Sequence, residues 1–225
     1  MRGPSLLTLF VRFCVLLGLI GGALGVWVRI WWHQRRPGAD ASGLVAAELR
    51  FAKRFVAVAV RYKGGLIKIG QVASLRVDVL PREVSDVLAR LQDRVDPHPL
   101  AEIERQIAHE LGGPIADHFA RFEPVPIASA SLGQVHAAWL PDGRKLAVKV
   151  LYPGVERSVA VDLVAARFGL WLFDFLTVAD LAGVYREIRD SILGEMDYER
   201  EGRAAEEVAA NLAADPEVAS RVRVP

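Results

Sequence analysis

The sequence contains little of what cysteine chemistry and nucleic-acid binding require. Cys14 is the only cysteine among 225 residues, which excludes an intramolecular disulfide and a cysteine-based metal site and indicates a reducing compartment. The 28 basic and 27 acidic residues give a net charge of +1, far from the strongly basic balance of a nucleic-acid-binding protein. We therefore expect no nucleic-acid partner.

Acidic residues are absent before Asp40, where a basic, apolar leader gives way to the rest of the chain. The leader holds five arginines of the 28 basic residues, which leaves 23 basic against all 27 acidic residues in the remainder. The whole chain is 52% hydrophobic with a mean hydropathy of +0.24, and much of this apolar character lies in the leader. A mildly acidic body therefore follows a basic, apolar segment.

Residues 1–32 are predicted to form a hydrophobic membrane-anchor helix. Residues 13–28 are uncharged, and these 16 residues would reach ~24 Å as a helix, against the ~30 Å of a hydrocarbon core. The apolar residues on either side supply the missing length if Arg12 and Arg29 snorkel to the two interfaces. The tryptophans and arginines at the end of this segment predict a body on the cytoplasmic side of the membrane; they are Trp27, Trp31, Trp32, Arg29, Arg35 and Arg36.

Two other interpretations of the leader stay open. An interfacial helix would lie on the membrane without crossing it. A cleaved signal peptide would need a small-x-small cleavage site, and no clear one precedes the tryptophan-rich end. Membrane lipid is an expected partner if the leader is a spanning anchor or an interfacial helix.

The remaining chain divides into a linker at 33–43, a helical extension at 44–121 and a mixed region at 122–225. In the extension, hydrophobic periodicity and proline or glycine boundaries predict helices at 44–62, 66–76, 83–92 and 100–111. In the mixed region, the pattern predicts strands at 127–140 and 146–152, then helices at 155–175 and 181–212. A β-hairpin among helices predicts an α+β fold.

Lys149 stands inside the apolar strand predicted at 146–152, either at an exposed edge or buried with a partner. The preceding segment occupies the frame of the kinase loop G-x-G-x-x-G-x-V, with alanines in the first two glycine places. Such a loop joins two strands and lays backbone N–H groups over nucleotide phosphates, and the second strand then delivers a lysine. The residues in this frame are Ala128, Ser129, Ala130, Ser131, Leu132, Gly133, Gln134 and Val135.

A kinase lysine needs a glutamate from the following helix. The acidic segment at 195–201 supplies candidates, including Glu195, Asp197 and Glu201. Because its acids recur at a four-residue spacing along a predicted helix, a solvated acidic face is the alternative interpretation. Lys68 lies in a glycine-weakened helix, and an ordinary surface lysine is the alternative there.

Several motifs in one order resemble the AarF/UbiB atypical kinases, the group that includes the coenzyme Q kinases. Lys68-Ile-Gly70-Gln71 is similar to the KxGQ signature of that family, and Glu195-Met-Asp197 is similar to its ExD signature. Supporting segments lie at 80–81, 91–93, 126–136 and 147–154, so the resemblance runs from about residue 63 to residue 225.

The resemblance implies roles for these positions. An alanine-rich loop at 128–131 replaces the glycine-rich loop, while Lys149 and Glu201 form the ion pair that orients the nucleotide. Lys68 reaches over the active site toward Glu195 and Asp197 and limits access to protein substrates. The implied cofactors are ATP and Mg²⁺, and the implied setting is quinone biosynthesis, often at membranes.

The residues that a phosphotransferase keeps in its large lobe are missing from the sequence. Asn211 is the only asparagine and Glu206 stands five residues before it, so the pattern H-R-D-x-x-x-x-N is excluded, and D-F-G is absent. We therefore expect a helical extension followed by an incomplete kinase-like small lobe, with the large lobe absent. No metal site is predicted in these residues.

Two functions follow from these expectations. One is the ATP-binding portion of an atypical kinase or ATPase of membrane quinone or lipid metabolism, not catalytically competent as this chain alone and served by a separate large-lobe chain or by quinone-biosynthesis proteins. The other is a non-catalytic, membrane-anchored interaction module that retains a relic nucleotide site. Nucleotide binding distinguishes them.

Overall fold

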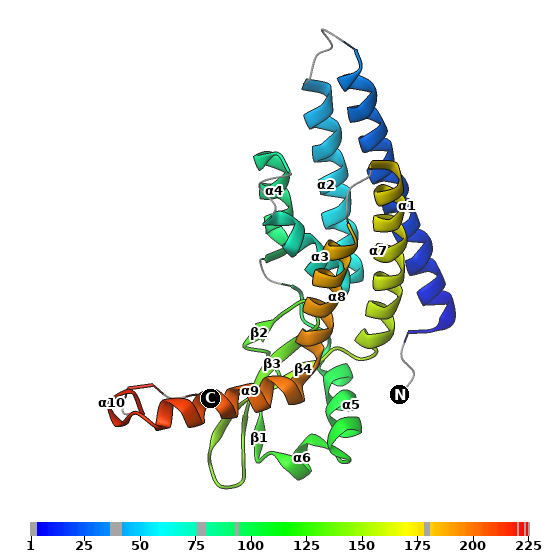
Figure 1. The fold of residues 1–225 in the computed structure, drawn as a ribbon. Helices are drawn as coiled ribbons and strands as arrows, with labels where there is room; N and C mark the ends of the chain where they lie inside the picture. Colours follow the sequence, from blue (N-terminus) through cyan, green and yellow to red (C-terminus); the bar gives the residue numbers. More distant parts are fainter. Residues whose placement is uncertain are drawn as a thin grey trace.

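The computed structural model describes residues 4–36, 42–75, 80–92, 95–177, 181–219, 221–222 and 224. Long helices stand above a small antiparallel sheet (Figure 1), which confirms the predicted α+β arrangement. Residues 37–41 of the predicted linker and residue 76 of a predicted helix lie outside the described residues.

The helices of the N-terminal half follow the predicted boundaries closely. Pro81 and Pro99 each precede a helix, where a missing backbone N–H costs no hydrogen bond. Gly112 adopts a left-handed conformation and ends the helix that Pro99 begins. The elements are α1 (Leu6–Gln34), α2 (Ser42–Tyr62), α3 (Gly65–Ser74), α4 (Arg82–Ala89), the 3₁₀ helix η1 (Arg90–Gln92), α5 (Leu100–Leu111) and α6 (Ile115–His118).

The sheet is built around one long strand. β3 (Gly133–Trp139) pairs along one edge with the short strands β1 (Arg121–Phe122) and β2 (Ala128–Ser129) and along the other with β4 (Lys145–Leu151), all antiparallel. The predicted 127–140 strand is therefore a β2–β3 hairpin, because residues 130–132 turn the chain.

β4 differs from the apolar, two-sided strand that its sequence suggests. Residues 145–147 and Lys149 are exposed and Val150 is buried, because β4 pairs with β3 alone among the described strands. Lys149 therefore lies at an exposed edge, which was one of the two predicted alternatives.

The prediction of a single continuous helix at 181–212 is wrong. The segment is divided into α8 (Ala182–Met196) and α9 (Tyr198–Ala213), which follow α7 (Val155–Thr177) and precede α10 (Pro216–Ala219). Asp197 breaks the helix: its backbone leaves the helical region, and its side chain accepts a hydrogen bond from the Arg200 N–H at 2.9 Å. Aspartate is a favoured N-cap because its carboxylate satisfies such an N–H group.

The core joins the two halves of the chain. Ile103 and Ile107 of α5 pack with Val150 of β4, and Ile188 and Ile192 of α8 belong to the same cluster. A second cluster contains Leu16 and Leu19 of α1, together with residues of α2, α3 and α7. The sheet and the helical layer are therefore held in one body by buried apolar contacts.

Arg12 of α1 is buried, with 5% of its surface exposed. Its Nε and Nη2 donate to the two carboxylate oxygens of Asp162, both at 2.6 Å. Its Nη1 also donates to the carbonyl of Tyr62 at 2.7 Å, and Nη2 donates to the carbonyl of Lys63 at 2.9 Å. We call this set of contacts between Arg12, Asp162 and the α2–α3 turn at residues 62–66 the Arg12 clasp. The expectation that Arg12 would snorkel to a membrane interface is wrong, because its charge is paired inside the protein.

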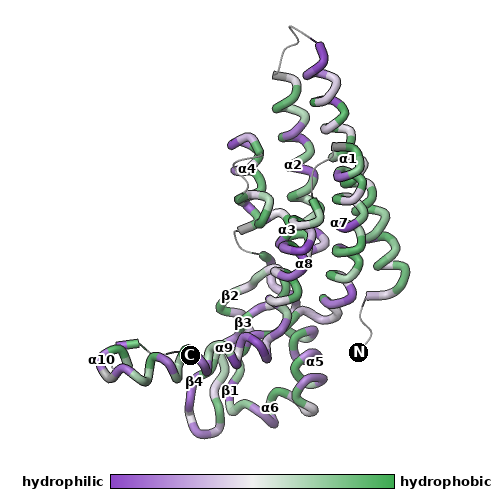
Figure 2. The backbone as a smooth tube through the Cα atoms, viewed as in Figure 1, coloured by the Kyte–Doolittle hydropathy of each residue, from purple (hydrophilic) through white to green (hydrophobic). Residues whose placement is uncertain are grey.

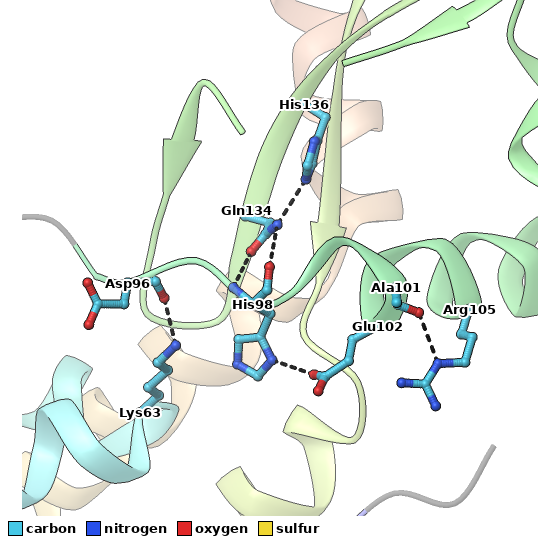
Figure 3. A network of polar contacts seen from close by, with 8 residues as sticks. All are labelled: Lys63, Asp96, His98, Ala101, Glu102, Arg105, Gln134 and His136. Atoms are coloured by element: carbon cyan, nitrogen blue, oxygen red, sulfur yellow. Dashed lines mark hydrogen bonds and ion pairs between the residues drawn. The ribbon is translucent and has the colours of Figure 1, made fainter. Parts of the chain in front are cut away.

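A polar network fastens the segment before α5 to the sheet (Figure 3). Buried Gln134 of β3 accepts a hydrogen bond from the His98 N–H at 2.8 Å and donates to the His98 carbonyl at 3.4 Å. Its side-chain amide thus bonds to the backbone as a neighbouring strand would. His136 bonds to Gln134 at 2.9 Å and to the Glu123 carbonyl at 2.8 Å, and His98 bonds to Glu102 at 2.8 Å.

Candidate functional site

A cleft of about 370 Å³ opens where the β2–β3 hairpin, β4 and the α8–α9 junction meet. Most of the site residues predicted from the sequence line it, although they come from distant parts of the chain. Its walls are formed by Gln71, Val95, Ser129, Ala130, Ser131, Leu132, Gly133, Val135, Lys149, Glu195, Tyr198 and Glu201.

The alanine-rich loop is a tight turn between β2 and β3. The Ala130 N–H donates to the Gly133 carbonyl at 2.8 Å, and the Tyr152 hydroxyl donates to the Ala130 carbonyl at 3.0 Å. The Ser131 carbonyl accepts from the Gly64 N–H at 3.2 Å, so the loop also touches the α2–α3 turn. These bonds hold the loop in place from both sides.

Gly133 cannot be replaced by a larger residue without moving its neighbours. A Cβ atom there would lie 2.5 Å from the Val150 carbonyl oxygen and 2.9 Å from the Tyr198 hydroxyl. The third glycine place of the kinase-like frame therefore serves close packing of β3 against β4 and α9. Ala128, in the first glycine place, pairs with Val135 in the hairpin but does not line the cleft.

Lys149 and Glu201 form an ion pair across the cleft. Lys149 Nζ lies 2.7 Å from Glu201 Oε2, and the two side chains keep 42% and 46% of their surface exposed. The sheet register places Lys149 opposite Val135, so the lysine stands beside the end of the loop. An exposed pair of this kind contributes only about 0–1 kcal/mol to stability, so its position matters more than its contribution to folding.

Tyr198 belongs to the site, although sequence reasoning gave it no role. Its ring lies under the Lys149 ammonium group, 4.4 Å from Nζ. Burial raises the pKa of its hydroxyl well above the usual value, and the nearby carboxylates of Glu201 and Glu195 raise it further. The available signal was its place directly after Asp197, as the first residue of a helix whose acids were already candidates.

Lys68 and Glu195 form a second ion pair beside the cleft. Lys68 Nζ on α3 donates to Glu195 Oε1 at the end of α8. The side chains are 19% and 39% exposed, so this contact is better shielded from water than the Lys149 pair. The structure thus brings the KxGQ lysine to the first acid of the ExD segment, as the resemblance implied.

Gly70 and Gln71 position α3 against its neighbours. A Cβ on Gly70 would lie 2.2 Å from Leu91 Cδ1 and 2.8 Å from Phe55 Cε1, which leaves room for glycine only. The Gln71 amide donates to the Leu91 carbonyl at 2.9 Å, and Gln71 also lines the cleft. Both residues therefore fix α3 against η1.

Asp197 does not join the other acids. Asp197 lies between α8 and α9 and caps α9, and its carbonyl accepts a hydrogen bond from the Glu201 N–H at 3.1 Å, one turn further along. Asp197, Lys68 and Gly70 do not line the cleft.

The donors and acceptors around the cleft fit a polyphosphate ligand. Lys149 and residues 129–133 of the short loop line it, and such a loop can offer backbone N–H groups to phosphates. Among the described residues, no three His, Cys, Asp or Glu side chains gather closely enough to hold a metal ion. Glu195 and Glu201 are the carboxylates of the cleft, and Mg²⁺ commonly combines one or two carboxylates with substrate phosphates.

Comparison with known proteins gives consistent matches. A family described as the ABC1 atypical kinase-like domain matches residues 90–225. The Saccharomyces cerevisiae protein named "Atypical kinase COQ8, mitochondrial" is 37% identical over 164 residues, which are 69% of this chain and 32% of that protein. The Pseudomonas fluorescens "Probable protein kinase UbiB" is 36% identical over 195 residues, which are 82% of this chain and 34% of that protein.

Two further comparisons extend the set. The Marinobacter nauticus "Probable protein kinase UbiB" is 48% identical over 97 residues, which are 43% of this chain and 18% of that protein. A solved structure, Rv3197 with erythromycin from Mycobacterium tuberculosis, is 31% identical with a TM-score of 0.44 and covers 73% of this chain and 44% of that chain. The chain thus spans about a third or less of the length of these curated relatives.

Proposed function

Because the chain belongs to the ABC1 atypical kinase-like family, we propose that its cleft is the small-lobe half of an ATP-binding site. The predicted resemblance to the AarF/UbiB kinases is thereby confirmed. The observation that carries the proposal is the Lys149–Glu201 pair, which stands in one cleft with the loop at 129–133.

Lys149, its two neighbours and the loop take distinct parts in nucleotide binding. Lys149 donates to the α- and β-phosphates, while Glu201 and the Tyr198 ring hold the ammonium group in place. Backbone N–H groups of the alanine-rich loop cover the phosphates, except that of Ala130, which donates to the Gly133 carbonyl. Mg²⁺, when bound with the nucleotide, neutralises phosphate charge, and Glu195 and Glu201 are the carboxylates near enough to take part.

Lys68 restricts entry to this site. Its bond to Glu195 ties α3 of the extension to the end of α8, so the extension lies over one side of the cleft. A bulky protein substrate would have to break this pair. The substrate that fits is therefore a small acceptor, and the naming of the relatives as COQ8 and UbiB kinases leads us to place it in quinone or lipid metabolism.

The chain is proposed to act at a membrane, through α1. By length and composition, α1 is the one helix among the described residues that could cross a bilayer. Exposed Arg29 on α1, and Arg35 and Arg36 directly after it, favour the cytoplasmic side for the body. The domain division of the proposal is an anchor at 1–32, a linker at 33–43, an extension at 44–121 and a small lobe at 122–225.

Nucleotide binding by the 225-residue chain tests the proposal. We expect a fluorescent ATP analogue with Mg²⁺ to bind, and Lys149→Ala to weaken binding about 10- to 100-fold, since a charge-assisted hydrogen bond contributes ~1.5–3 kcal/mol. Lys145→Ala is the matched control, because Lys145 is exposed on the same strand outside the cleft. Equal affinities for the two variants would contradict the site.

The same preparation distinguishes the alternative function. The 225 residues contain no catalytic H-R-D-x-x-x-x-N segment, so we expect binding without ATP turnover until a large lobe is supplied. If the wild-type chain ignores ATP and Mg²⁺ altogether, a membrane-anchored interaction module with a relic site is the better description.

A further inference from the structure

One side of α1 packs against the protein core. Leu16 and Leu19 are buried in the cluster shared with α2, α3 and α7, and Arg12 is held by the Arg12 clasp. To cross a bilayer as an isolated anchor, α1 would have to leave these contacts and carry Arg12 into hydrocarbon, where an unpaired charge is strongly disfavoured. Its place in the fold instead indicates a helix that stays attached to the body.

The opposite surface of α1 is apolar and exposed. Leu6, Leu7 and Phe10 expose most of their surface near its beginning, and Trp32 does so near its end. The Arg35 and Arg36 guanidinium groups lie over the rings of Trp31 and Trp32, 3.7 and 4.8 Å from the centroids. Aromatic rings beside arginines, with no acid anywhere on α1, are typical of a helix end that lies at the interface of an anionic membrane.

α7 carries a second exposed apolar stripe. Phe168, Trp171 and Phe175 are 43%, 59% and 75% exposed. Their rings follow one another with centroid separations of 6.0 and 6.3 Å, because spacings of three and four residues put them on one helix face. We call these three residues the α7 aromatic ladder. None of its three residues lines the nucleotide cleft.

The two stripes lie side by side. α1 and α7 run in the same direction, since Arg12 meets Asp162 and, further along both helices, Ile20 packs against Gly169. Phe168 directly precedes Gly169, so the ladder flanks the seam between the helices. Figures 1 and 2 show α1 and α7 next to each other, with hydrophobic residues along both.

We propose that α1 and the α7 aromatic ladder form one membrane-docking surface, on which the protein lies without crossing the bilayer. The partner is an anionic phospholipid surface: α1 supplies apolar area and arginines, and the ladder adds three aromatic side chains that enter the interfacial region. The inference rests on the proposed membrane attachment and specifies its geometry. The nucleotide cleft lies at the other end of α7 and stays accessible, because residues of β4 and α9 rather than the ladder line it.

Vesicle binding tests the contribution of α7. The full chain is mixed with vesicles of equimolar phosphatidylcholine and phosphatidylglycerol, and the bound fraction is measured by flotation. We expect the triple variant Phe168→Ser, Trp171→Ser, Phe175→Ser to bind at least about ten-fold more weakly, because aromatic area no longer leaves water on docking. Val208→Ser is the control, since Val208 is an exposed apolar residue on α9, away from both stripes.

Labelling of single cysteines tests whether α1 crosses the bilayer. In a Cys14→Ser background, Ser5→Cys places a thiol at the exposed beginning of α1. A membrane-impermeant maleimide added outside the vesicles should react with it, because the interfacial arrangement keeps both ends of α1 on one side. Protection of this thiol would mean that α1 spans the membrane and would overturn the proposal.

The outcomes separate this inference from the proposed function. Equal vesicle binding by wild type and the ladder variant would overturn the inference while membrane attachment stands. The α7 aromatic ladder would then be a candidate contact surface for a protein partner. Failure of the wild type to bind vesicles would overturn both the inference and membrane attachment. ATP binding, measured on the same samples, confirms that the ladder variant remains folded.

Discussion

Replacing Arg12 by leucine removes the centre of the Arg12 clasp. The guanidinium donates two hydrogen bonds to Asp162 and one each to the Tyr62 and Lys63 carbonyls. Loss of one partner from a buried ion pair costs ~3–5 kcal/mol, because the other charge is left unpaired. A shift of ~2–4 °C per kcal/mol is typical for a domain of this size, so we expect thermal denaturation, followed by circular dichroism in mild detergent, to begin about 10 °C lower.

The pH dependence of the melting temperature of Arg12→Leu is a second test of the same ion pair. Burial raises the pKa of Asp162, while Arg12 lowers it; without Arg12 the rise is larger. A carboxyl with a raised pKa in the folded state contributes stability below its unfolded pKa, and that contribution is lost as pH rises through the folded value. The melting deficit of Arg12→Leu should therefore shrink as pH falls from neutral toward the ordinary value of 3.8.

Two variants complete this experiment. Arg29→Leu changes an exposed arginine of the same helix and should alter stability by no more than ~0.5 kcal/mol. The double variant Arg12→Leu, Asp162→Leu removes both charges and should recover much of the loss, since apolar replacements of buried pairs are often tolerated. The reasoning is refuted if Arg12→Leu has the same melting temperature as Arg29→Leu. It is also refuted if the double variant is less stable than Arg12→Leu.

Two further predictions concern the site. Gly70→Ala places a Cβ 2.2 Å from Leu91 Cδ1 and should lower the free energy of unfolding by ~1–3 kcal/mol, measured by thermal denaturation. Gly21→Ala is the control, because its Cβ meets nothing within 4 Å. Equal melting temperatures for the two variants would contradict the close packing of α3. Tyr198→Leu removes the ring beneath Lys149 and should weaken binding of the ATP analogue about two- to five-fold, the size of an exposed cation–π contact. Tyr198→Phe should bind like wild type, and a Leu variant that binds equally well would exclude a role for the ring.

Local patterns predict most of the elements because their causes are local. The helix that Pro99 begins and Gly112 ends is predicted to the residue, since both boundaries depend on the backbone of the residues themselves. The order of loop and lysine likewise predicts that Lys149 lies beside the loop, because a hairpin joins them. Glu201 was one of several candidate acids, and only the family resemblance singled it out as the partner that Lys149 has in the structure. The approach of Lys68 to the acidic segment was likewise implied by the family resemblance, and in the structure its partner is Glu195.

Contacts that depend on a distant partner are not visible in such patterns. Arg12 and Asp162 each look like a charge misplaced in an apolar run, and only packing of α1 on α7 turns them into a pair 150 positions apart. The break at Asp197 has a local cause, but an uninterrupted helical pattern conceals it until the capping bond to Arg200 is seen. The exposure of β4 depends on the number of strands beside it, which no single strand encodes.

The α2–α3 turn has a consequence for how the ends of the molecule influence each other. The carbonyls of Tyr62 and Lys63 face Arg12, whereas the next amide, that of Gly64, holds the Ser131 carbonyl of the alanine-rich loop. Residues 62–64 thus contact both α1 and the alanine-rich loop of the cleft. We therefore expect a substitution that displaces this turn to disturb the Arg12 clasp and the alanine-rich loop together.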